Sequence, residues 1–285
     1  MNETRRLLVT TDGSPKSRAV LPHAAAFAKA WGAELVLLQV IDLKQDTRAG
    51  EDQTATSERI KAELASQIER IGLEATPRVA VLQPQEDVAG VILRVAQESG
   101  AGLLAMQSRG HGALRHAIAG SVAMKLIEKS NLPVLVGGDS IDIPPRPDEK
   151  YHIVVTSDGS HASGEIVRAL RDIVRGASFK VTVMRIYEPA IGDRGEEVEI
   201  AEAEKQLREL ASTLSGEVEV DIFVRKITPM GGIDTAVMEK ATEAHADAIA
   251  LSTHGYSARR HLLMGSTGAQ LLGRSVLPVI LAHAD

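Results

Sequence analysis

Two short phrases in this sequence carry side chains suited to holding a ligand, and each phrase occurs twice. Asp12-Gly13-Ser14 directly follows an apolar, β-branched run, and Asp158-Gly159-Ser160 does the same about 145 residues later. In a doubly wound parallel sheet, ligands bind beyond the carboxyl ends of the strands. We therefore expect Asp12 and Asp158 to lie at a binding edge, and helix N-capping is the alternative role for their carboxylates.

The second phrase is a glycine-containing loop that opens a helix. It reads Ser108-Arg109-Gly110 and then, after nine further residues, Gly120-Ser121; the later copy reads Thr253-His254-Gly255 and Gly265-Ser266. Glycine lets a phosphate approach the main chain, and the unpaired N–H groups at a helix start attract anions. Neither Gly-x4-Gly-Lys-Ser/Thr nor Gly-x-Gly-x-x-Gly occurs, so the common nucleotide motifs are absent. The pattern predicts a phosphate site of another type.

A third repeated phrase shows that the whole chain is duplicated. Leu132-Pro133-Val134-Leu135-Val136 recurs as Leu277-Pro278-Val279-Ile280-Leu281. Three matched phrases in the same order at a nearly constant offset indicate two copies of one domain, and 285 residues suit two domains. We predict domains over residues 1–140 and 151–285, joined by a polar, proline-stiffened linker over residues 141–150.

The elements that must position these phrases alternate along each half. Short β-branched runs alternate with longer alanine-rich stretches, a pattern typical of a parallel sheet covered by helices. The predicted strands are 7–11, 35–41, 79–82, 103–106 and 134–136, and then 153–156, 181–186, 218–224, 248–251 and 279–281. Helices are predicted over 15–31, from the end of a polar segment (42–57) to Gly72, over 87–99 and from Ser121. The predicted fold class is therefore α/β, with a doubly wound sheet in each half.

Composition excludes several classes of protein. The chain has no cysteine, which removes disulfides, thiolate metal sites and cysteine catalysis. A net charge of −6 and an aromatic content of 2% argue against nucleic-acid binding, which needs clustered cations and stacking rings. The charged Met1–Arg6 leads straight into a strand, and no apolar run reaches membrane-spanning length. We expect a cytoplasmic protein that contacts neither membrane nor nucleic acid.

The remaining polar patterns predict no catalytic or metal centre. The nine histidines show no metal-ligand spacing on a helix; the pairs His111/His116 and His254/His261 fall around the glycine loops and are interpreted as loop residues. No Gly-x-Ser-x-Gly elbow occurs, and no general base is evident beside the phosphate loops. A run of glutamates is interpreted as a solvated helix face that suits the helix dipole: Glu196, Glu197, Glu199, Glu202 and Glu204.

Taken together, the strand with its Asp-Gly-Ser ending, the glycine loop and the closing Pro-Val strand resemble the universal stress protein family. The resemblance covers essentially the whole chain, as two tandem domains. It implies five-stranded parallel sheets of order 3-2-1-4-5, of the adenine nucleotide alpha hydrolase-like type. It also implies a stress-response or regulatory factor that binds ATP, alone or with Mg.

The resemblance assigns ligand contacts in both halves. Asp12 and Asp158 would lie near the adenosine, with main-chain groups of Val40 and Ile186 at the adenine edge. Phosphates would be held in the first half by Gly110, Gly120 and Ser121. In the second half the corresponding set is Ser252, His254, Gly255, Gly265, Ser266 and Thr267.

Two departures from the family's ATP motif, Gly-x-x-Gly-x9-Gly-Ser/Thr, separate the halves. The first glycine is Gln107 in the first half and Ser252 in the second, and Arg109 stands where the family has histidine. Gln107 is bulky where the chain would lie against ribose, so the second half is the stronger candidate for an ATP site. Alternatively, Arg109 and His111 could pair with phosphates in the first half.

The closing strands predict how the halves associate. Residues 134–136 and 279–281 are apolar and would form sheet edges, which favours pairing. In the family this strand pairs antiparallel with its counterpart, so we expect an internal pseudo-dimer, with a homodimer through the same strands as the alternative.

Three functions are compatible with the residues. In the first, nucleotide binding orders the glycine loops and so acts as a switch for unidentified protein partners. The others are a slow ATPase and a scaffold that binds a different small molecule or only proteins.

Overall fold

The computed structural model describes residues 4–70, 72–109, 119–146, 149–160, 162–187, 196–214, 219–226, 232–253 and 264–282. The first half contains strands β1 (Arg6–Thr11), β2 (Glu34–Ile41), β3 (Thr76–Val81), β4 (Leu103–Gln107) and β5 (Val134–Gly137). Its helices are α1 (Leu21–Trp31), α2 (Leu43–Asp46), α3 (Gln53–Arg70), α4 (Val88–Ser99) and α5 (Ser121–Lys129). The order of strands and longer helices is the one that the sequence predicts.

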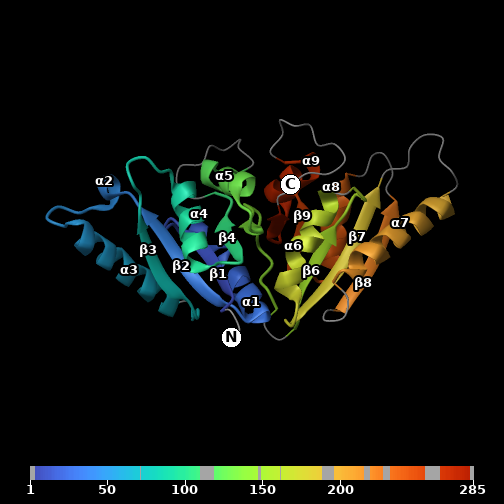
Figure 1. Ribbon diagram of the computed structural model, residues 1–285, viewed down its shortest axis with the longest axis horizontal. Helices are drawn as coiled ribbons and strands as arrows, with labels where there is room; N and C mark the ends of the chain where they lie inside the picture. Colours follow the sequence, from blue (N-terminus) through green and yellow to red (C-terminus); the bar gives the residue numbers. More distant parts are fainter. Residues whose placement is uncertain are drawn as a thin grey trace.

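The second half repeats this order (Figure 1). Its strands are β6 (Tyr151–Thr156), β7 (Phe179–Tyr187), β8 (Glu219–Lys226), β9 (Ala248–Ser252) and β10 (Val279–Ala282). Its helices are α6 (Glu165–Val174), α7 (Glu196–Ser212), α8 (Ile233–Glu243) and α9 (Ser266–Arg274). No helix in the described part of the chain is long and apolar enough to cross a membrane.

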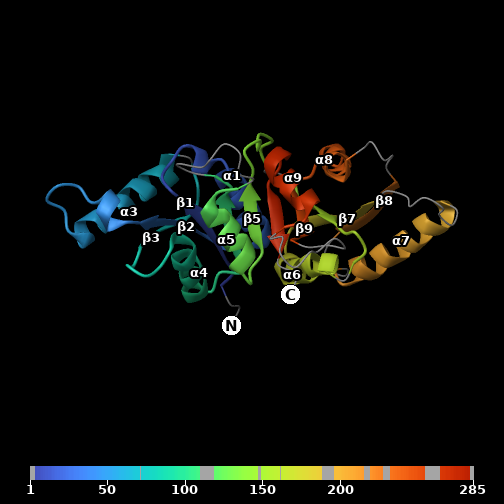
Figure 2. The ribbon, with the colours of Figure 1, turned by 90° about the horizontal axis from the view of Figure 1, so that it is seen from above.

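The ten strands of the described residues join one sheet of order β3-β2-β1-β4-β5-β10-β9-β6-β7-β8. Each half therefore has the predicted order 3-2-1-4-5, and the pairs within each half are parallel. The halves meet through β5 and β10, which pair antiparallel with Leu135 opposite Ile280. The internal pairing of the closing strands is thus confirmed, and β5 lies at the junction when the molecule is viewed from above (Figure 2).

The hydrophobic core is divided by the faces of the sheet and not by the halves. One cluster packs α1, α3, α6 and α7 against one face, and a second packs α4, α5, α8 and α9 against the other. Figure 1 shows α5 and α9 together above the junction and α1 below it. Each cluster contains residues of both halves, so neither half encloses a core of its own.

An aromatic cluster fills the junction on the α1 face. The chain has one Trp, three Tyr and three Phe, and four of these rings meet here: Phe27, Trp31, Tyr151 and Phe179. The ring of Phe27, from the first half, lies 5.2 Å from that of Tyr151 and 5.1 Å from that of Phe179. Edge-to-face and tilted contacts at these distances stabilise beyond the area they bury.

The segment between the halves is bound to the protein on both sides, which its polar, proline-rich sequence did not predict. The N–H of Asp142 donates to Val276 O, and the N–H of Arg146 approaches the buried carboxylate of Asp247 at 3.4 Å. His23 of α1 hydrogen-bonds the backbone of Ile143, while burial lowers the pKa of His23 to about 4. The neutral imidazole therefore joins this segment to the first half at physiological pH.

Two predictions for helices are wrong, and local polar side chains explain both. The helix expected from Pro15 begins as a short 3-10 turn (Lys16–Arg18), and α1 starts only at Leu21. Here the hydroxyl of Ser17 donates to Ser14 O and contacts the hydroxyl of Thr11, which competes with helical hydrogen bonding.

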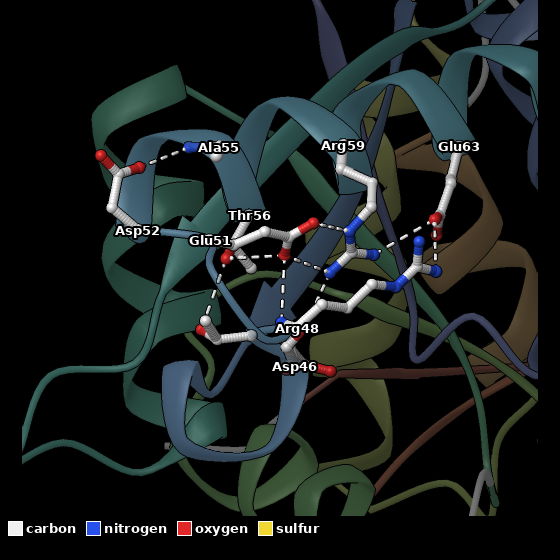
Figure 3. A network of polar contacts seen from close by, with 9 residues as sticks. Asp46, Arg48, Glu51, Asp52, Ala55, Thr56, Arg59 and Glu63 are labelled. Carbon is white, nitrogen blue, oxygen red and sulfur yellow. Dashed lines mark hydrogen bonds and ion pairs between the residues drawn. The ribbon is translucent and has the colours of Figure 1, made fainter.

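In the polar segment, Asp42 caps the unpredicted helix α2 by accepting from the N–H of Lys44. The segment between α2 and α3 is held by the network of Figure 3. Arg59 of α3 donates to both carboxylate oxygens of Glu51 and to Asp46 O.

The Arg59 guanidinium lowers the pKa of Glu51 to about 2, so that this carboxylate is ionised at neutral pH. The same carboxylate accepts from the N–H of Arg48 and from the hydroxyl of Thr56, which fixes the loop at the start of α3.

The shared core predicts that the halves unfold together. Replacing the fully buried Phe27 by alanine removes three ring contacts, two of them between halves, and should cost about 3–5 kcal/mol. Urea unfolding followed by Trp31 fluorescence and by far-UV circular dichroism should show one coincident transition in both proteins. Phe223→Ala on edge strand β8 is the matched control and should cost less. Separate transitions for the two probes would contradict the shared core.

Candidate functional site

The Asp-Gly-Ser phrases form the same turn at the end of β1 and of β6. The N–H of Ser160 donates to Asp158 Oδ1 at 2.9 Å, and Gly159 between them has φ +84°, a left-handed conformation that glycine adopts without strain. In the first half, the N–H of Ser14 donates to Asp12 Oδ1 at 3.0 Å. Both aspartates thus close Asx turns. The alternative was that the aspartates cap the following helix, but the N-cap residues of α1 and α6 are Val20 and Gly164, and neither helix has a side-chain cap.

The start of α9 is a second component of the site. Gly265 is its N-cap residue, and no side chain caps the helix. The N–H of Gly265 donates to Thr253 O at 2.9 Å, which fixes the helix start beside the end of β9. An uncapped first turn directs N–H groups and the positive end of the helix dipole outward. Helix α5 is arranged in the same way, with Gly120 as an N-cap that donates to Ser108 O at 2.7 Å.

These components enclose a cavity of about 320 Å³ in the second half. The cavity brings together six residues that the sequence assigned to the site: Asp158, Ile186, Ser252, Gly265, Ser266 and Thr267. Two other assigned residues, His254 and Gly255, lie outside the described residues. The cavity therefore has a carboxylate, hydroxyls and the bare helix start along its lining.

The apolar wall of the cavity was not predicted. It consists of Ile233 and Val237 of α8 with Leu251 of β9, next to Ile186 of β7. Ile233 and Val237 stand four apart and so lie on one face of the helix, a spacing that could have pointed to them. Thr156, Ser157, Ser163, Thr253 and Gly268 complete the lining.

The first half has the same backbone arrangement. Asp12 follows β1, Val40 lies in β2, and Gly120-Ser121 opens α5, whereas Gly110 lies outside the described residues. No group of three or more potential metal ligands occurs among the described residues. His111, His116, His254 and His261 lie outside them, so their predicted role as loop residues stays a prediction.

Gln107 and Ser252 occupy equivalent strand positions but make different contacts. Gln107 is buried and donates through Nε2 to Gly138 O at 2.7 Å, and its neighbour across the strand pair is Gly137. Ser252 accepts the N–H of Ile166 at 3.1 Å, and its cross-strand neighbour is Ala282. The extra bulk of Gln107 is thus taken up at β5, where glycine leaves room for it.

Arg109 forms an ion pair within the first half. Its guanidinium contacts the carboxylate of Asp139, which Lys16 also approaches at 2.8 Å. A phosphate that binds Arg109, as the sequence suggested, would therefore have to compete with Asp139. Asp139 follows β5 and was not singled out in the sequence.

Comparison with known proteins identifies the family. The model of the universal stress protein family matches residues 3–136 and again residues 151–283. The chain belongs to the universal stress protein family. Universal stress protein MJ0577 of Methanocaldococcus jannaschii is 27% identical over 159 residues, covering 46% of this chain and 93% of the relative. A Thermus aquaticus universal stress protein is 29% identical over 134 residues, covering 46% of this chain and 97% of the relative.

Solved structures of universal stress proteins share the whole fold. One from Archaeoglobus fulgidus covers 98% of both chains with a TM-score of 0.63 at 21% identity. One from Pseudomonas aeruginosa covers 99% of this chain and 94% of its own with a TM-score of 0.61 at 18% identity. At these identities the comparison concerns the fold alone. The two-half arrangement is therefore shared across nearly the full length of these chains.

The contact between Gln107 and Gly137 predicts that substitutions at these two positions have coupled effects on the stability of this universal stress protein. A Cβ at Gly137 would lie 2.3 Å from Gln107 Oε1 and 3.1 Å from Val20 Cβ, so Gly137→Ala should cost about 1–3 kcal/mol. In a Gln107→Ser background, the same alanine recreates the Ser252/Ala282 pair and should cost less, because only the tight contact with Val20 remains. Urea unfolding of the single and double variants measures the coupling. Additive costs would show that Gln107 does not set the size of residue 137.

Proposed function

We propose that this protein binds an adenine nucleotide, ATP first of all, in the cavity of its second half. In this proposal it is a regulatory stress-response factor, not a metabolic enzyme. The observation that carries the proposal is the cavity itself, in which one carboxylate, an apolar wall and an uncapped helix start converge. Its volume of about 320 Å³ falls at the lower end of small-molecule sites.

Each part of the cavity suits a different part of a nucleotide. The apolar wall of Ile186, Ile233 and Val237 suits a base, and the carboxylate of Asp158 can accept hydrogen bonds from ribose hydroxyls. The start of α9 suits phosphates, because its N–H groups and the hydroxyls of Ser266 and Thr267 can donate to phosphate oxygens. A Mg²⁺ ion on the phosphates would keep several waters and need few protein ligands.

The second half is proposed as the nucleotide site for two reasons. Its lining combines all the parts that a nucleotide requires, whereas in the first half Arg109 is paired with Asp139. Ser252 is also small, and its hydroxyl already accepts the N–H of Ile166, so it takes up little space at the end of β9. A cytoplasmic location and a signalling role through protein partners belong to the same proposal.

A negative charge introduced at the start of α9 should have opposite effects on ATP binding and on stability. Ser266→Asp places a carboxylate in the first helical position, which favours the helix dipole by about 0.3–1 kcal/mol but repels phosphates. ATP affinity, measured by titration calorimetry, should fall about tenfold or more, whereas the urea midpoint should stay or rise. The matched control, Ser121→Asp at the start of α5, should leave the affinity unchanged. Unchanged affinity in Ser266→Asp, or a loss in Ser121→Asp, would contradict the proposed site.

Native mass spectrometry of freshly purified protein tests the ligand class directly. A tight site should retain a co-purified adenine nucleotide, at one per chain, and lose it in Ser266→Asp. A different bound small molecule would support the scaffold alternative and overturn the nucleotide proposal. Release of phosphate from added ATP, absent in Ser266→Asp, would instead support the slow ATPase.

A further inference from the structure

A second, larger depression lies where the two halves meet on the α1 face. It has a volume of about 960 Å³ and is bordered by the carboxyl ends of α1 and α6 and the start of β6. In Figure 1 this junction lies below the sheet, near the labels of α1 and β6. None of its described lining residues belongs to the nucleotide cavity. We propose that this groove binds a linear polyphosphate.

The groove is cationic although the chain as a whole is acidic. Arg5, Lys29 and Lys150 line it, and none of its described lining residues is acidic. Lys150 also pairs with Glu219, an exposed carboxylate outside the lining, at 3.4 Å. The chain carries a net charge of −6, so a local group of cations on a concave surface stands out. Clefts lined by one sign of charge concentrate ligands of the opposite sign. The groove therefore selects for an anion.

Arg5 is held in place by both halves. Its Nη1 donates to Trp31 O and its Nη2 donates to Arg175 O, each at 2.8 Å. These carbonyls belong to the ends of α1 and α6, where the helix dipoles are negative, so Arg5 offsets the field that would otherwise repel an anion. A guanidinium has five N–H donors. Arg5 thus has donor capacity beyond these two bonds, on a side chain that is already ordered.

The floor of the groove leaves the backbone accessible. Gly32 and Gly176 end α1 and α6 with φ +67° and +61°, and a Cβ at either glycine would meet no atom within 4 Å. Thr4 and Ser178 add hydroxyl groups to the lining. A phosphate chain can therefore approach the surface closely between the flanking cations.

The size and distribution of the charges favour a chain of phosphates over a single ion. Lys29 belongs to the first half, Lys150 precedes the first strand of the second half, and Arg5 bridges the two. A volume of about 960 Å³ is three times that of the nucleotide cavity, so one phosphate would leave most of it unfilled. A linear polyphosphate can contact cations from both halves at once.

Trp31 is the chain's single tryptophan and lines the groove but not the nucleotide cavity, so its fluorescence is a probe of ligand binding in the groove. Titration of the full-length protein with inorganic tripolyphosphate should shift its fluorescence saturably. Lys29→Gln/Lys150→Gln should weaken the apparent affinity about tenfold or more, since affinity for phosphates depends on the cations that contact them. Raising NaCl from about 0.05 M to about 0.3 M should weaken it as well.

Two controls decide between sources of the signal. Lys61→Gln/Lys205→Gln removes the same charge from exposed positions on α3 and α7 and should leave the response intact. Ser266→Asp should also leave it intact, because Trp31 does not line the nucleotide cavity. No saturable shift, a shift unaffected by the groove variants, or one lost in Ser266→Asp would overturn the proposal. An equal response to orthophosphate would overturn the assignment to a polyphosphate.

Discussion

The antiparallel pairing of β5 with β10 is the constraint on which the rest of the molecule depends. Each half is an open parallel sheet whose closing strand would expose unpaired backbone groups and apolar side chains. The pairing of Val134–Gly137 with Val279–Ala282 uses these groups within one chain. Because the sheet then continues without a break, each of its faces is covered by helices of both halves. The domain division seen in the sequence is thus not a division of the core.

Duplication preserved the backbone of this universal stress protein more closely than its side chains. The Asx turns at Asp12 and Asp158 and the bare helix starts at Gly120 and Gly265 agree in detail. Elsewhere, equivalent positions reach the same contact by different chemistry. Arg6 donates to Ser99 O at the start of β1, and at the equivalent point of β6 the ring Nδ1 of His152 lies 3.0 Å from Ala244 O.

Gln107/Gly137 and Ser252/Ala282 are likewise two solutions to one packing problem.

The sequence predicts those features that depend on periodicity and on turn residues. The positions of the strands along the chain, the glycine turns and the helix starts follow from β-branched runs and from Gly-Ser pairs, which have few alternative conformations. The order of the strands in the sheet was implied by the resemblance to the family and not by these patterns. The sequence does not predict which hydrogen-bond partner a polar side chain finds. Ser17 shortens α1 by bonding Ser14, Asp42 creates a helix by capping it, and Gln107 turns toward Gly138. In each case the outcome depends on a partner that only the folded chain supplies. The docking of the segment near Ile143 is not predictable for the same reason, since its partners His23 and Val276 are far away in sequence.

The two proposed sites attract anions by different physical means. Among its described lining residues, the nucleotide cavity contains no lysine or arginine and one carboxylate, so the groups that these residues offer to phosphate are backbone N–H groups, hydroxyls and the dipole of α9. Such groups keep their partial charges at any pH and act only at close range. The groove depends instead on the full charges of Arg5, Lys29 and Lys150, which act over about a Debye length and are screened by salt. A short-range site suits selection of one ligand by shape, whereas a long-range site suits capture of a flexible polyanion such as linear polyphosphate. In these two proposals, the acidic protein discriminates among phosphates by structure at the cavity and by charge density at the groove.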